Sequence, residues 1–194
     1  MNSPPGAAKT KTRVTLLMLA AVFVLPLVLA WVLTSGPLDW RPAKTANNGV
    51  LLASPLRLNS YGVMDDTGAG LTVDLIAGDW FLVVLRGLAC TEPCQRWLQI
   101  AERIQIAVGR DTPRVKLALL RPGDDEPVSR WQSWLLPADG RLIGALRRAM
   151  EEPQLDTALL IVDHQGRVVL IYPPTEDGPG VLDDLKRLLR ASAR

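Results

Sequence analysis

The sequence predicts an α/β domain that follows a single membrane-spanning helix, and two observations lead to this expectation. Residues 14–33 (VTLLMLAAVFVLPLVLAWVL) carry no charge, and these twenty residues match the length that crosses the hydrocarbon core of a bilayer. After residue 50, short apolar runs alternate with segments whose apolar side chains recur at helical spacing. This alternation is typical of a sheet covered by helices.

The residues around the apolar run predict whether it is cleaved and how it is oriented in the membrane. A cleaved signal peptide is the alternative to an anchor, but its apolar core is usually only about 7–15 residues long and a small-residue cleavage site follows it. No such site follows Leu33. Lys9, Lys11 and Arg13 precede the run without an acidic neighbour, so the positive-inside rule leaves them in the cytoplasm. We therefore expect a cytoplasmic tail over residues 1–13, a transmembrane helix over 14–33, a linker over 34–49 and an exported domain over 50–194.

Charge and composition restrict the function classes. The chain has 22 Lys and Arg against 20 Asp and Glu. Without the three basic residues of the tail, 22 − 3 leaves 19 against 20, a net charge of −1 on the remainder. Nucleic acid binding is not expected at this charge. The chain holds only one histidine, so histidine-based catalysis is not expected either.

The first elements of the domain form a predicted β-α-β unit. Residues 71–76 and 80–85 are strand candidates, and the second is apolar throughout, as expected for a strand buried on both faces. Apolar side chains at helical spacing predict a helix over 94–108, which Thr91 is placed to cap. Residues 115–120 form the next strand, and the helical crossover makes it a parallel neighbour of the strand before the helix.

Beyond residue 120 the pattern predicts further helices and a hairpin. Residues 129–134 suggest a short helix, in which Trp131 and Trp134 either form a patch for a partner or are both buried. The remaining elements are a helix over 142–150, strands over 157–162 and 167–172 around a tight turn, and a helix over 181–190. A cysteine motif after the second strand of this β-β-α-β-α-β-β-α order predicts a thioredoxin-like fold.

Cys90 and Cys94 are the two cysteines of the chain, and they stand where an apolar run gives way to a helical pattern. At this spacing their sulfurs fall on one face of a helical segment, within reach of a disulfide. The positive end of a helix favours the thiolate, which is both a nucleophile and a metal ligand. The pair is therefore a candidate redox site and a candidate copper site, since Cu(I) accepts thiolates readily. A purely structural disulfide is the alternative.

The chain resembles the Sco/SenC proteins, and among them the Sco-like transmembrane proteins associated with bacterial cytochrome c oxidase assembly. The likeness rests on the anchor and linker, on the CxxxC motif between a strand and a helix, and on residues 160–169 (LIVDHQGRVV). It implies a periplasmic thioredoxin-like domain on a single-pass protein of the bacterial inner membrane. It further implies that this domain delivers copper to oxidase subunit II, or reduces the cysteines of the copper site there, with other assembly factors as further partners.

The sequence departs from that family at the third copper ligand, which is a histidine in typical Sco proteins. The corresponding place holds residues 155–157 (LDT). The one histidine, His164, lies in a predicted turn and is expected to be a solvated loop residue. Met64 and Met150 are soft donors, but neither lies in a motif.

The sequence is therefore consistent with three alternative functions. The first is an accessory factor for oxidase maturation that acts through Cys90 and Cys94 on copper or on thiols. The second is a membrane-anchored thiol-disulfide oxidoreductase without a metal, which is the most that the sequence supports as an enzyme. The third is a thioredoxin-like binding module whose cysteines form only a structural disulfide.

Overall fold

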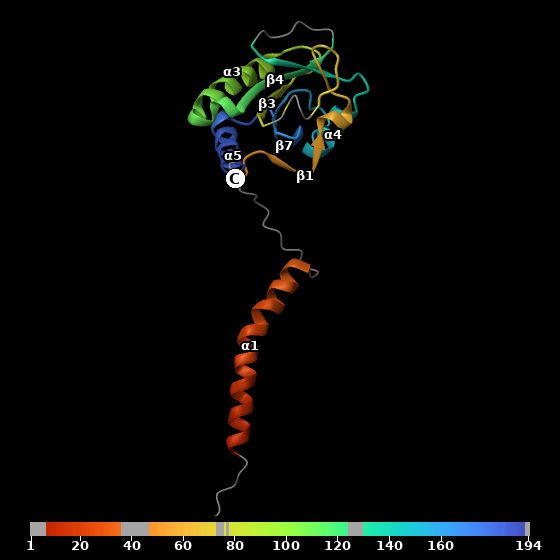
Figure 1. Ribbon diagram of the computed structural model, residues 1–194. Coiled ribbons are helices and arrows are strands. Elements are labelled where there is room, and N and C mark those ends of the chain that lie inside the picture. Colours follow the sequence, from red (N-terminus) through yellow and green to blue (C-terminus); the bar gives the residue numbers. More distant parts are fainter. Residues whose placement is uncertain (1–6, 36–46, 73–75, 77, 124–129, 193–194) are drawn as a thin grey trace, which may run out of the picture. The chain divides into compact units, whose positions relative to one another are not determined.

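The computed structural model describes residues 7–35, 47–72, 76, 78–123 and 130–192, which fall into two compact units, Met1–Lys44 and Thr45–Arg194. Helix α1, Ala7–Ser35, forms the first unit (Figure 1). Within the described residues, no helix combines the length and the apolarity that crossing a membrane requires. The transmembrane helix over 14–33 stays a prediction, and most of the predicted linker lies outside the described residues.

The second unit is built on a seven-stranded sheet with β3 at its centre, in the order β1-β7-β6-β3-β4-β5-β2. Strand β3 pairs in parallel with β4 and antiparallel with β6, so both of its edges are satisfied. The strands are β1 Val50–Arg57, β2 Met64–Asp65, β3 Trp80–Leu85, β4 Val115–Pro122, β5 Gln132–Leu136, β6 Ala158–Val162 and β7 Arg167–Tyr172. Short 3₁₀ turns follow β1 (Leu58–Tyr61) and precede β4 (Gly109–Arg114).

Helices cover both faces of this sheet (Figure 1). Helices α3 (Glu92–Ala107) and α5 (Gly178–Ala191) contribute to one core, and α4 (Arg141–Met150) contributes to the other. The side chains of β3 alternate between these cores, because successive residues of a strand point to opposite faces. This double burial explains why β3 is apolar throughout. The β3 residues of the α3 and α5 core are Trp80, Leu82 and Val84, and those of the α4 core are Phe81, Val83 and Leu85.

The structure confirms the α/β thioredoxin-like class and most of the predicted elements. The strand over 80–85, the helix of the β-α-β crossover and the parallel strand after it are present. The hairpin of β6 and β7 and the two later helices also form where the sequence predicts them.

The predicted short helix over 129–134 is wrong. Strand β5 occupies this place and pairs in parallel with β4. Trp131 and Trp134 are an odd number of residues apart, so on an extended chain they point to opposite faces and enter the two different cores. Both indoles are buried, which excludes the docking patch.

The predicted strand over 71–76 is absent from the described part of this segment. Leu71 and Thr72 belong to no strand, Ile76 is helical, and residues 73–75 lie outside the described residues. Leu71 and Ile76 are nevertheless buried in the α4 core. Their apolar character therefore reflects packing from a connecting segment rather than strand pairing.

A buried carboxylate ties the start of the domain to its last helix. Asp184 of α5 is 1% exposed and accepts hydrogen bonds from the backbone N–H groups of Asn48 (2.7 Å) and Gly49 (3.0 Å). It also accepts one from the hydroxyl of Tyr172, at 2.9 Å. Burial, and second the charge of Asp184, raise the pKa of Tyr172, so this hydroxyl keeps the proton that it donates. The cluster holds the chain entering β1 against α5.

Replacing Asp184 by Ala should lower the free energy of unfolding by about 3 kcal/mol, because the substitution leaves several buried donors without their charged acceptor. Chemical denaturation of the full chain measures the loss. Asp183→Ala is the matched control, since Asp183 is exposed on the same helix, and it should leave the stability unchanged. Equal effects of the two substitutions would show that the buried carboxylate has no special role.

Candidate redox site

The site begins where β3 ends. After Leu85 the chain leaves the sheet, passes through residues 86–91 and enters α3 at Glu92. Thr91 takes the N-cap position with an extended backbone, as the sequence predicts, but in the structure its hydroxyl makes no capping hydrogen bond. Pro93 follows in the first turn, where its missing N–H costs no helical hydrogen bond.

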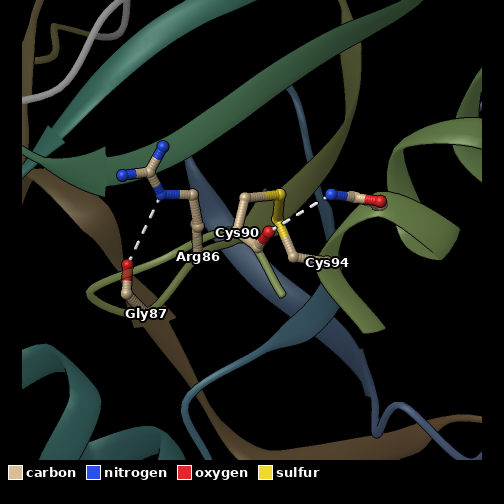
Figure 2. Close-up of a disulfide and its surroundings, with 5 residues drawn as sticks. Arg86, Gly87, Cys90 and Cys94 are labelled. Atoms are coloured by element: carbon tan, nitrogen blue, oxygen red, sulfur yellow. Dashed lines mark hydrogen bonds between the residues drawn. A yellow bond between two sulfur atoms is a disulfide. The ribbon is translucent and has the colours of Figure 1, made fainter. Parts of the chain in front are cut away.

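Cys90 and Cys94 form a disulfide across this strand-to-helix junction, with their Cα atoms 5.2 Å apart (Figure 2). Cys94 lies in the first turn of α3 and is fully buried. Cys90 precedes the helix and is half-buried, and the Gln95 side chain donates a hydrogen bond of 3.5 Å to its carbonyl oxygen. The pair is therefore asymmetric, because Cys90 meets solvent and Cys94 does not.

This disulfide is a weak structural cross-link. It joins residues only four positions apart, within one loop and the first turn of the helix that follows. Closing a loop of about five residues stabilises a fold by about 2 kcal/mol in the chain-entropy model, and longer loops contribute more. The bond connects no distant elements, so a purely structural role explains little about its position.

Two arginines, Arg86 and Arg121, lie near the carboxyl ends of the parallel strands β3 and β4, where the cysteine loop leaves the sheet. The backbone N–H of Arg86 donates to Leu120, and the Nε of the buried Arg121 donates to the hydroxyl of Ser133 at 2.6 Å. Burial, and second the charge of Arg121, lower the pKa of the Arg86 guanidinium. Figure 2 shows Arg86 on the loop that leads to Cys90. The Nε of Arg86 donates to the carbonyl oxygen of Gly87 at 3.5 Å, within the same loop.

These arginines were not among the predicted site residues. Each arginine follows an apolar run that forms a strand, and this position is the feature of the sequence that could have identified it. The parallel register places Leu85 opposite Leu120, and it therefore brings the two arginines together.

The segment before β6 lies on the other side of the loop. A Cβ atom added to Gly87 would stand 3.2 Å from the Cβ of Asp156, so the loop passes close to this segment. Thr157 is 1% exposed, and its hydroxyl has no hydrogen-bond partner among the described residues. The residues in place of the third Sco ligand thus adjoin the loop, but none of them is a soft donor or an imidazole.

His164 is remote from the cysteines. It lies in the turn between β6 and β7, where its ring packs against Trp80 with 6.4 Å between ring centroids. Trp80 begins β3 and the cysteine loop follows its end, so the length of the strand, roughly 16 Å at about 3.3 Å per residue, separates them.

The two methionine candidates also lie elsewhere. Met64 is in β2 at the far edge of the sheet, and Met150 packs against the core on the α4 face. Within the described residues, no group of three or more His, Cys, Asp or Glu side chains could hold a metal. Among the described residues, the site therefore offers two thiols, and no histidine or carboxylate joins them as a third ligand.

A thioredoxin fold with a cysteine pair between a central strand and the next helix defines the class of this protein. The family model described as the C-terminal domain of transmembrane-like, thioredoxin-like proteins matches residues 80–192, more than half of the chain. The chain belongs to this family. A comparison with curated proteins finds no match.

The comparison with solved structures shows that this chain has a Sco-like thioredoxin fold. Copper-bound yeast Sco1 is 13% identical with a TM-score of 0.51, over 76% of this chain and 100% of that chain. Copper-bound ScoI of Arabidopsis thaliana is 14% identical with a TM-score of 0.48, over 72% and 99% of the two chains. The exposed lipoprotein thioredoxin Etrx1 of Streptococcus pneumoniae is 14% identical with a TM-score of 0.43, over 69% and 99%. At these identities the likeness concerns the fold alone.

After mild reduction, iodoacetamide should modify Cys90 at least about tenfold faster than Cys94, because a buried thiol reacts slowly. Mass spectrometry of the peptides at short reaction times measures both rates. The Cys90→Ser variant is the control, and its remaining thiol should stay slow to react. Equal rates in the folded wild-type protein would contradict the asymmetry described above.

Proposed function

We propose that the protein is a membrane-anchored thiol-disulfide exchange factor, in which Cys90 attacks and Cys94 resolves. The observation that carries this proposal is the asymmetric disulfide at the strand-to-helix junction, half-exposed at Cys90 and buried at Cys94. The short span of the bond supports the same conclusion.

The exchange has three steps. A donor dithiol first reduces the Cys90–Cys94 disulfide and is itself oxidised. The Cys90 thiolate then attacks one sulfur of a partner disulfide, and the other partner sulfur leaves as a thiolate that takes up a proton. The Cys94 thiolate next attacks the Cys90 sulfur of this mixed disulfide and releases the second partner thiol. The partner gains two electrons and two protons, and the Cys90–Cys94 disulfide forms again.

We place this exchange in cytochrome c oxidase assembly, as the Sco resemblance implies. The partner is then the cysteine pair of the copper site in oxidase subunit II, or another assembly factor. The domain works in the periplasm of a bacterium, held to the inner membrane by residues 14–33. The Sco-like fold and the transmembrane-like family support this placement.

Copper delivery is the second candidate function, and the copper-bound state of the yeast Sco1 structure favours it. Copper would be the cargo, and the reduced thiols of Cys90 and Cys94 would hold it. The described residues offer no histidine beside them, so the two thiolates would be its protein ligands.

Trapping the mixed disulfide tests the exchange. Cys94→Ser removes the resolving thiol, so a partner should stay bound to Cys90 and appear as a dithiothreitol-sensitive adduct on a non-reducing gel of membrane extracts. Cys90→Ser is the matched control, and it should form no adduct. Both variants should impair oxidase maturation. If neither variant traps a partner and both mature the oxidase normally, the pair is a structural disulfide in a binding module.

His164→Ala should leave Cu(I) binding by the reduced full chain unchanged, because this imidazole packs at the opposite end of β3. Cys90→Ser should weaken the binding strongly. Competition with a chromogenic Cu(I) chelator measures both, and near-ultraviolet circular dichroism checks that each variant is folded. Loss of Cu(I) from a folded His164→Ala protein would restore a three-ligand copper site.

A reporter fused after Arg194 should be active only when it is of the type that works in the periplasm, because an uncharged run after a basic tail directs the C-terminal side outward. The full chain should also remain in the membrane fraction after a salt wash. Recovery of a soluble mature protein that begins near Ser35 would contradict the anchor.

A further inference from the structure

Leu88 is the most exposed large apolar side chain among the described residues. It lies in the loop between β3 and α3, two positions before Cys90, and is 92% exposed. Its neighbour Ala89 is exposed as well, and Pro93 is partly exposed on the other side of the motif. Solvation of a leucine side chain costs free energy, and Leu88 contributes to neither core.

The backbone groups of Leu88 are also available for hydrogen bonds. Among the described residues, neither its N–H nor its carbonyl group takes part in a hydrogen bond. The loop is nevertheless held on both sides, because Gly87 lies close against Asp156 and the amide of Thr91 donates to Ala89. Leu88 therefore presents an apolar side chain, a backbone N–H and a carbonyl group to solvent. The loop that carries it is held in place by its neighbours and lies beside the accessible Cys90.

We propose that Leu88 is a docking residue for the exchange partner, and that the partner presents an apolar side chain within one or two positions of its reactive cysteine, on an extended segment. This inference rests on the proposed exchange function. The apolar contact buries Leu88, and the free backbone groups of Leu88 bond to the main chain of the partner segment. The contact aligns the partner sulfur with Cys90.

Synthetic peptide disulfides provide the probes. Two peptides differ only in the residue beside the cysteine, leucine in one and serine in the other, and glutathione disulfide serves as a probe with no apolar neighbour. The pre-reduced full chain in detergent reduces each probe, and second-order rates are measured by chromatography of the products. Ile106→Ser is the matched control for Leu88→Ser, since Ile106 is 74% exposed near the opposite end of α3.

The wild-type chain should reduce the leucine peptide about tenfold faster than the serine peptide, as expected when about half of a leucine side chain is buried in the encounter. Leu88→Ser should abolish this preference while its rates with the serine peptide and glutathione disulfide stay at the wild-type values. Ile106→Ser should behave as the wild type.

Two results would overturn the docking role. One is a Leu88→Ser protein that keeps the preference for the leucine peptide. The other is an equal slowing with all three probes, which would show that Leu88 supports the loop rather than the partner. A wild-type chain that reduces none of the probes would refute the exchange function itself, and the docking role with it.

Discussion

The burial of β3 on both faces is the constraint on which the rest of the structure depends. Its six side chains alternate between two cores, and its edges are paired by β4 and β6. A strand enclosed on four sides ends at a defined place, so the loop after Leu85 and the start of α3 are defined too. The positions of Cys90 and Cys94 depend on this strand. Its length also separates the cysteines from His164, which packs against Trp80 at the opposite end.

The proposed chemistry of the site depends on how little of the fold the disulfide supports. A bond between positions four apart can open without releasing any strand, because the sheet and both cores hold β3, and packing against one core holds α3. One sulfur belongs to a half-exposed residue and the other to a buried one, and the proposed exchange gives the attacking role to the first and the resolving role to the second. Arg86 and Arg121 lie near the carboxyl ends of β3 and β4, the edge of the sheet from which the cysteine loop leaves.

The sequence predicts the core of this arrangement and misses its surroundings, for physical reasons. The continuous apolar run of β3 and the helical period of α3 are local patterns, so they place the cysteines correctly. Trp131 and Trp134 fit one face of a helix as well as two faces of a strand, and only pairing with β4 decides between them. Arg86 and Arg121 meet through a parallel register. Neither that register nor the exposure of Leu88 is encoded in a local pattern.

The equilibrium between the Cys90–Cys94 disulfide and a graded dithiol buffer tests the central claim, that this pair exchanges electrons with a partner. We predict that the native full chain is reduced in a single two-electron step with a midpoint above about −300 mV, the level below which structural disulfides usually lie. The reduced protein should keep its near-ultraviolet circular dichroism. A disulfide that resists the buffer below this potential, or that opens only when the domain unfolds, would contradict the claim.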